Sequence, residues 1–129
     1  MFPKVEIMAS SSSLKNYTPH EVIVMDTNGT TPLDRFPPQE TTIRLLGSDQ
    51  KHIESIGPIR VVTRPTYTGL NYTPPEGESI IVSMVVAEYM VAQNMHQKYQ
   101  IYVPDSSPKG AVRDEMGVIK GVRQLVRYF

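Results

Sequence analysis

The chain contains no cysteine and no tryptophan among its 129 residues. Without cysteine it cannot form disulfides or thiolate metal sites, and it has no cysteine nucleophile. Its longest apolar run, Ile80 to Val86 interrupted by Ser83, is far too short to cross a bilayer. The N-terminus also lacks the basic and then apolar segments of an export signal. We therefore expect a soluble protein of a reducing cytoplasm, with no membrane partner.

A net charge is absent as well, because 13 Lys and Arg balance 13 Asp and Glu. A chain without an overall positive field does not attract nucleic acid non-specifically, so we expect no nucleic-acid partner. The sequence has neither a glycine-rich phosphate loop nor a Gly-x-Ser-x-Gly elbow. Neither His52 nor His96 has a second ligand at metal spacing. We predict a protein that is not an enzyme and uses no cofactor or metal.

Eleven prolines, eight glycines and many threonines favour short strands joined by turns. The length suits a single core. We predict an α+β fold, with a β-rich domain over residues 16–129 and a flexible, serine-containing N-terminal arm over residues 1–15. The domain should hold one twisted, mostly antiparallel sheet and one main helix at about residues 84–97, which Ser83 would cap.

The stretch NYTPHEVIVMD, residues 16–26, combines the residue types of a helix start with those of a strand. Because the apolar residues end at Asn28-Gly29, a strong hairpin signal, we predict a turn at 18–21 followed by a strand and a returning strand through Phe36. Further strands are expected at 41–46, at 59–70 with an interruption at Pro65, and at 99–103, with a loop at 47–57. Residues 112–128 are predicted to form a closing hairpin with its turn at 115–117.

Five arginines in or beside predicted strands are the main candidates for a binding site: Arg44, Arg60, Arg64, Arg113 and Arg123. A guanidinium matches phosphate or carboxylate in two-bond geometry, so several of them on neighbouring strands would form an anion-binding groove. Tyr102 is a candidate for stacking on a base in that groove. The alternative is that these arginines face solvent and pair with acids, and that Tyr102 packs as a half-buried strand residue.

His20 lies at the mouth of the first buried strand, where an imidazole could act as a general base, as a metal ligand or as part of an anion site. Asp105 and Asp114-Glu115 could act as paired carboxylates. The alternative for the histidine is a hydrogen bond to a loop carbonyl, and for the acids an Asx turn and a hairpin ion pair. An enzyme built on His20, Asp105 and Asp114 is the least favoured hypothesis.

Four segments carry a family resemblance: Asn16-x-Thr18-Pro-His20, Val82-Ser83, Val103-Pro-Asp105 and Arg113-Asp-Glu-x-Gly117. With them the chain resembles a family of small, largely uncharacterised proteins encoded by bacteriophages and by bacterial genomes with phage-like genes. The resemblance implies a phage accessory protein in the host cytoplasm, and it favours binding over catalysis. One hypothesis is a counter-defence protein that sequesters an anionic, nucleotide-derived host signal. The other is a structural or assembly protein of the virion. A homo-oligomer is expected in either case, since residues 80–90 carry excess apolar surface.

Overall fold

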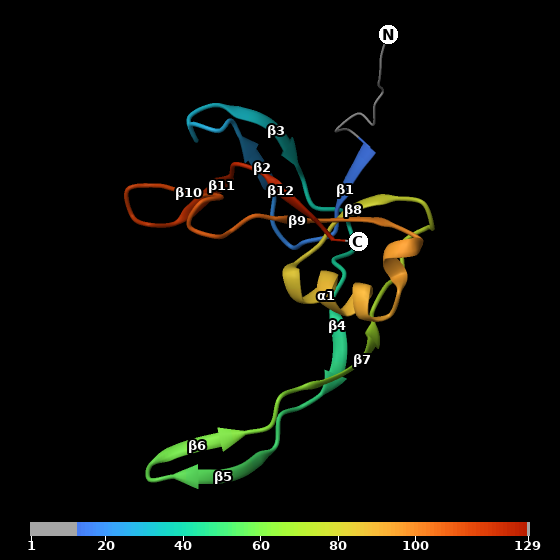
Figure 1. Cartoon of the computed structure of the whole chain (residues 1–129), viewed down its shortest axis with the longest axis vertical. Helices are drawn as coiled ribbons and strands as arrows, with labels where there is room; N and C mark the ends of the chain where they lie inside the picture. The colour runs from blue at the N-terminus through green and yellow to red at the C-terminus, as the bar shows by residue number, and fades with distance from the viewer. Residues whose placement is uncertain (1–12, 129) are drawn as a thin grey trace.

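The computed structural model describes residues 13–128 (Figure 1). These residues form two four-stranded sheets, one α-helix and a two-stranded arm that projects from the body. In chain order the elements are β1 (Leu14–Asn16), β2 (Val22–Met25), β3 (Pro32–Phe36), β4 (Leu45–Ser48), β5 (His52–Ile56), β6 (Ile59–Val62), β7 (Thr66–Leu70), β8 (Ser79–Ile81), α1 (Met84–Ala92), a short 3-10 helix (Met95–Gln97), β9 (Gln100–Pro104), β10 (Ala111–Arg113), β11 (Ile119–Val122) and β12 (Leu125–Tyr128).

The first sheet has the order β1-β8-β9-β12. Strands β1, β8 and β9 are parallel, and β12 is antiparallel to β9. Helix α1 contacts β9 and β12 and closes one face of this sheet. The core under the helix includes Ile80, Met90 and Ile101, none of which is exposed to solvent. Burying each such side chain stabilises the fold by about 1.5–3 kcal/mol.

The second sheet has the order β10-β11-β2-β3, in which β11 is parallel to β2 and the outer pairs are antiparallel. It packs against the other face of β8. Successive residues of a strand point to opposite faces, so Ile80 faces the helix while Ile81 joins Val22 and Phe36 in a second core cluster. Ile80 and Ile81 of β8 are consecutive apolar residues because both faces of this strand are covered.

The arm comprises residues 45–70 and projects away from both sheets (Figure 1). Near the body it consists of β4 paired with β7, and farther out of β5 paired with β6. Two hydrogen bonds between Lys51 and Thr63 connect these two parts into one ribbon. No residue of the arm is buried, and only Leu45 and Leu70, at its base, pack against the first core cluster.

The predicted α+β fold, rich in strands and with one main helix, is confirmed, but the sheets are mixed and not mostly antiparallel. The predicted hairpin through Asn28-Gly29 is present as β2 and β3. Residues 1–12 of the predicted N-terminal arm lie outside the described residues, whereas Leu14 and Lys15 belong to β1. The parallel neighbours of β1 and β2 come from distant parts of the chain, which local patterns do not reveal.

Several predicted boundaries are wrong. Helix α1 ends at Ala92 because Asn94 adopts a left-handed conformation with φ 60°, and the predicted continuation to 97 is a separate 3-10 turn. The predicted loop at 47–57 contains strand β5, whereas the predicted interruption at Pro65 is present as the break between β6 and β7. The predicted closing hairpin is interrupted at Arg123, so that β11 joins the second sheet and β12 the first.

Candidate interaction surfaces

The Asn-x-Thr-Pro-His segment is a structural turn held by Asn16, whose side chain is 1% exposed. Its amide nitrogen donates to the backbone carbonyls of His20 and Phe36, both at 2.8 Å. Its amide oxygen accepts from the backbone N–H of Thr18 at 2.9 Å and from the hydroxyl of Thr18 at 2.6 Å. His20 takes part through its carbonyl, while the residue itself is exposed. The turn predicted at residues 18–21 is therefore present, with Asn16 as its organising residue.

The two predicted acidic sites also form turns. The carboxylate of Asp105 accepts from the backbone N–H of Ser107 and from the side-chain amide of Gln124. Hydrogen bonds from the Ser107 side chain, Gln124 and the Ser107 backbone lower the pKa of Asp105. Asp114 Oδ1 accepts from the backbone N–H groups of Met116 and Val118. Both carboxylates thus shape the loops that precede and follow β10.

The five candidate arginines do not converge on one cleft. Arg44 precedes β4, while Arg60 and Arg64 lie in the outer arm. Arg113 is on β10 and Arg123 follows β11, and Figure 1 places this hairpin far from the arm. An anion-binding groove would therefore contain only some of these five arginines.

The two candidate arginines on and beside the β10–β11 hairpin, Arg113 and Arg123, donate to backbone carbonyls. Arg113 donates to the carbonyl of Gly117 at 2.6 Å. Arg123 donates to the carbonyls of Thr27 at 3.1 Å and Ala111 at 2.8 Å, which ties the β2–β3 turn to β10. The hydroxyl of Tyr102, the predicted stacking residue, lies 3.4 Å from the Gln100 side-chain oxygen. Among the described residues, Arg44, Arg60 and Arg64 have no hydrogen bond or ion pair through their guanidinium groups.

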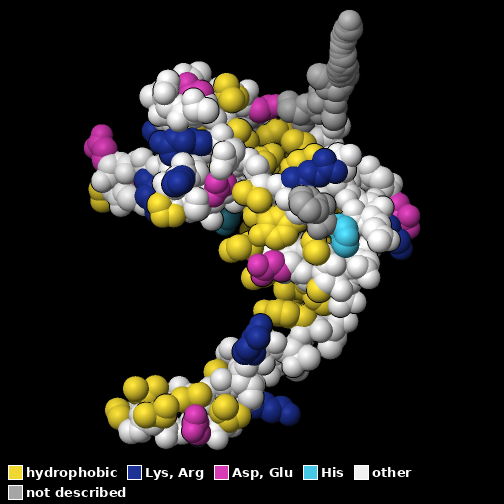
Figure 2. Space-filling model, viewed as in Figure 1, with side chains coloured by type: hydrophobic (Ala, Val, Ile, Leu, Met, Phe, Trp, Pro, Cys, Tyr) yellow, Lys and Arg dark blue, Asp and Glu magenta, His cyan; other side chains and the backbone are white. Residues whose placement is uncertain are grey.

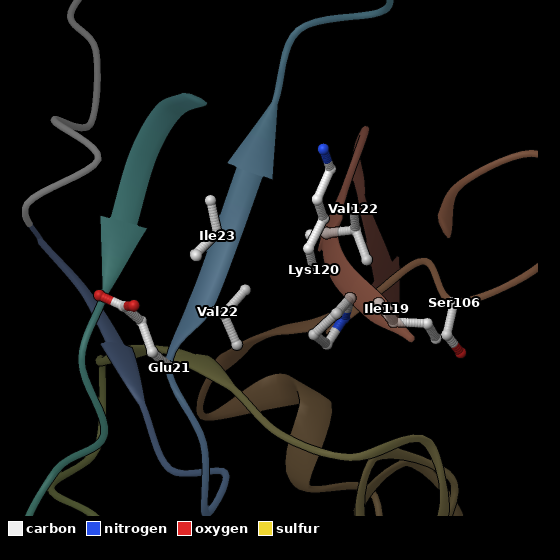
Figure 3. A pocket seen from close by; sticks show the side chains of 9 residues that line it. Glu21, Val22, Ile23, Ser106, Ile119, Lys120 and Val122 are labelled. Atoms are coloured by element: carbon white, nitrogen blue, oxygen red, sulfur yellow. The ribbon is translucent and has the colours of Figure 1, made fainter. Parts of the chain in front are cut away.

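A small cavity lies where β2 meets β11 (Figure 3). Its volume is about 170 Å³, and much of its lining is apolar, including Val22, Ile119 and Val122. The polar ends of Glu21 and Lys120 point to different sides of it in Figure 3. Pockets for drug-sized ligands span about 300–1,000 Å³, so this cavity is too small to enclose a nucleotide.

The free end of the arm is the first large exposed apolar surface, which we call the arm tip: Ile53, Ile56 and Ile59. Each of these side chains is 60% exposed. Ile56 and Ile59 are cross-strand partners around a two-residue turn whose first residue, Gly57, has φ +58°. Glycine adopts this conformation without strain, and the proline after it has a fixed negative φ, as a II′ hairpin turn requires. This Ile-Gly-Pro-Ile pattern is the signal by which the sequence could have revealed the arm tip.

A second exposed apolar surface lies on the outer side of α1, and we call it the helix face: Met84 and Val85, together with Val126 of β12. Met84 and Val85 are each 52% exposed and Val126 is 40% exposed. Beside them, a groove of about 230 Å³ runs along the end of β9 and is lined by Met84, Val103, Pro104, Val126 and Tyr128 with Asp105. The exposed side of α1 carries these apolar residues beside the single charge of Glu88, and exposed apolar patches commonly mark contact sites. The helix face therefore has the character of a surface that another chain covers.

Comparison of the chain with protein-family models, with curated proteins and with solved structures finds no match. Within residues 13–128, no helix has the length and apolar character needed to span a bilayer. The same residues contain no cluster of three His, Asp or Glu side chains that could hold a metal ion. The arm tip, the helix face and the exposed guanidinium groups of Arg44, Arg60 and Arg64 are the surface features that bear on binding.

Proposed function

We propose that the protein is a non-enzymatic binding protein that joins an assembly through its arm. The observation that carries this proposal is a 26-residue ribbon, residues 45–70, which buries none of its own residues and exposes three isoleucines at its free end. An isolated two-stranded ribbon is marginally stable in water. Exposed strand edges and apolar tips also invite association. We therefore infer that the arm serves to contact another molecule.

The resemblance to phage-encoded proteins suggests where that contact would occur. A virion or its assembly intermediates would provide repeated protein surfaces for an arm, and host proteins in the cytoplasm are the other source of partners. Recognition in either case would combine backbone pairing along the ribbon with side-chain anchoring by the arm tip.

A photo-crosslinking amino acid placed at position 56 tests this proposal in cells that carry the gene. We expect covalent protein adducts at position 56, because the arm tip would lie within contact distance of its partner. The matched control is position 33, where Leu33 is 66% exposed on the body. If position 56 yields no more adducts than position 33, the arm is not a binding element and the proposal is wrong.

Removing the outer arm provides the companion variant. Ser48 and Thr66 are directly paired, so replacing residues 49–65 with Asn-Gly should close β4 and β7 with a two-residue turn. Every buried apolar residue of the described chain lies outside the arm, so we expect the free energy of unfolding to change by less than about 1 kcal/mol. Association should be lost while the body stays folded.

The second candidate function is sequestration of an anionic, nucleotide-derived signal, which the unpaired guanidinium groups of Arg44, Arg60 and Arg64 support. We expect a thermal shift of several degrees with cyclic dinucleotides or ADP-ribose derivatives, since a ligand at a hundred times its dissociation constant adds about 2.7 kcal/mol. Replacing the three arginines with glutamine should abolish the shift, whereas Arg127→Gln should not. If no anion in the panel raises the melting temperature, this candidate is eliminated.

A further inference from the structure

We propose that the arm tip of one copy docks on the helix face of a second copy, so that two chains clasp each other with their arms. This inference rests on the proposed function and names the partner as the same chain. It assigns the arm tip and the helix face to one contact.

The two surfaces match in chemistry. The arm tip presents three isoleucines on a narrow hairpin end, and the helix face presents Met84, Val85 and Val126 beside a groove. Insertion of a branched aliphatic side chain into an apolar groove next to flexible methionine removes apolar surface of both copies from water.

The charges around these surfaces are complementary. The arm, residues 45–70, carries three basic residues, Lys51, Arg60 and Arg64, against two acids, Asp49 and Glu54, so its formal charge is +1. Helix α1 carries one charged residue, the exposed Glu88, which has no hydrogen bond or ion pair among the described residues. Asp105 adds a second negative charge at the groove. An apolar tip with basic flanks therefore meets an apolar face with an acidic flank, which fixes orientation and disfavours tip-to-tip contact.

The geometry favours a second copy over contact within one chain. Figure 1 shows the arm leaving the body close to α1 and carrying its tip away from the helix. Figure 2 shows hydrophobic side chains at the end of the arm and on the body above it, with an open hollow between them. Two chains related by a two-fold axis would each place an arm in the hollow of the other. Every contact then occurs twice, as in other isologous dimers.

Sedimentation velocity of the full chain tests the arrangement. We expect the wild-type protein to dimerise between about 1 and about 100 µM, and we expect Ile56→Glu with Ile59→Glu, or Val85→Glu alone, to weaken dimerisation at least about tenfold. The control is Met116→Glu, at a side chain that is 86% exposed on the β10–β11 loop, which should dimerise as the wild type does. All substitutions are at exposed positions, and circular dichroism checks that each variant is folded.

Mixing the two defective variants separates this contact from other modes of association. A heterodimer of the arm-tip variant and the Val85→Glu variant retains one of the two contacts, an intact tip on an intact helix face. We expect the mixture to associate more strongly than either variant alone. If Val85→Glu dimerises normally, if mixing restores nothing, or if the wild-type chain stays monomeric, the arm exchange is wrong.

Cysteine cross-linking gives a readout that does not depend on a loss of binding. The natural chain has no cysteine, so Ile56→Cys and Val85→Cys introduce single thiols. Under mild oxidation we expect a mixture of the two to form a disulfide-linked dimer faster than either variant alone. Absence of that preference contradicts the proposal. If position 56 photo-crosslinks only to other proteins, the second copy is the wrong partner while the proposed function stands.

Discussion

Replacing Asn16 with alanine is expected to lower the free energy of unfolding by about 3–5 kcal/mol. The substitution removes two hydrogen bonds donated to the carbonyls of His20 and Phe36 and two accepted from Thr18. Because Asn16 is buried, water cannot replace these partners without opening the junction between β1 and the β2–β3 hairpin. Leaving buried polar groups unpaired costs more than the lost bonds alone.

Urea unfolding followed by circular dichroism measures this effect. Asn16→Asp should be at least as harmful, since an ionised carboxylate has no hydrogen to donate and would face two carbonyl oxygens. His20→Ala is the matched control and should change stability by less than about 0.5 kcal/mol, because the hydrogen bonds of His20 to Asn16 and Thr18 use only its carbonyl. A large effect at His20 with a small effect at Asn16 would mean that the imidazole, and not the amide, is the important group of this segment.

Replacing Gly110 with alanine is expected to cost about 3 kcal/mol. A Cβ at this position would overlap the carboxyl carbon and the backbone oxygen of Asp105. The loop cannot easily move away, because Gly110 donates its N–H to the Ser107 carbonyl and its own carbonyl accepts from the Arg123 N–H. The new methyl group must therefore displace the Asp105 turn or the start of β10.

The double variant Gly110→Ala with Asp105→Ala tests this explanation. Removing the carboxylate relieves one overlap but leaves the one with the backbone oxygen, so we expect partial and not full recovery relative to Asp105→Ala alone. Gly69→Ala is the control, since a Cβ there meets nothing within 4 Å and should change stability by less than about 0.5 kcal/mol. If Gly110→Ala is as harmless as Gly69→Ala in thermal and urea unfolding, the close packing of this loop does not limit stability.

These contacts change the interpretation of the segments that carried the family resemblance. Asn16, Asp105 and Asp114 each use side-chain oxygens to hold a turn, so the chemistry of these segments is accounted for by folding. The exposed surfaces that call for a functional explanation lie elsewhere, on the arm and on α1. Neither surface contains a motif that would be recognised as a site in a sequence.

The sequence by itself determined the features that depend on neighbouring residues. Asn28-Gly29 indicated the β2–β3 hairpin, whose loop is held by Asp26 accepting from the backbone N–H groups of Thr30 and Thr31. Ser83 starts α1 by accepting from the Val86 N–H. Both devices act across only a few residues. The absence of cysteine and the turn-rich composition limited the kinds of site and fold that the chain can form.

The tertiary structure alone decided which strands became neighbours and which side chains met. Strand β1 lies beside β8, more than sixty residues later, and Arg123 reaches a carbonyl of Thr27 across 96 positions. Such pairings are selected by the burial of both faces of the first sheet, which no local pattern specifies. These long-range pairings also place the candidate arginines on separate parts of the fold. The outer side of α1 and the arm tip remain exposed, because neither contributes a residue to the two core clusters.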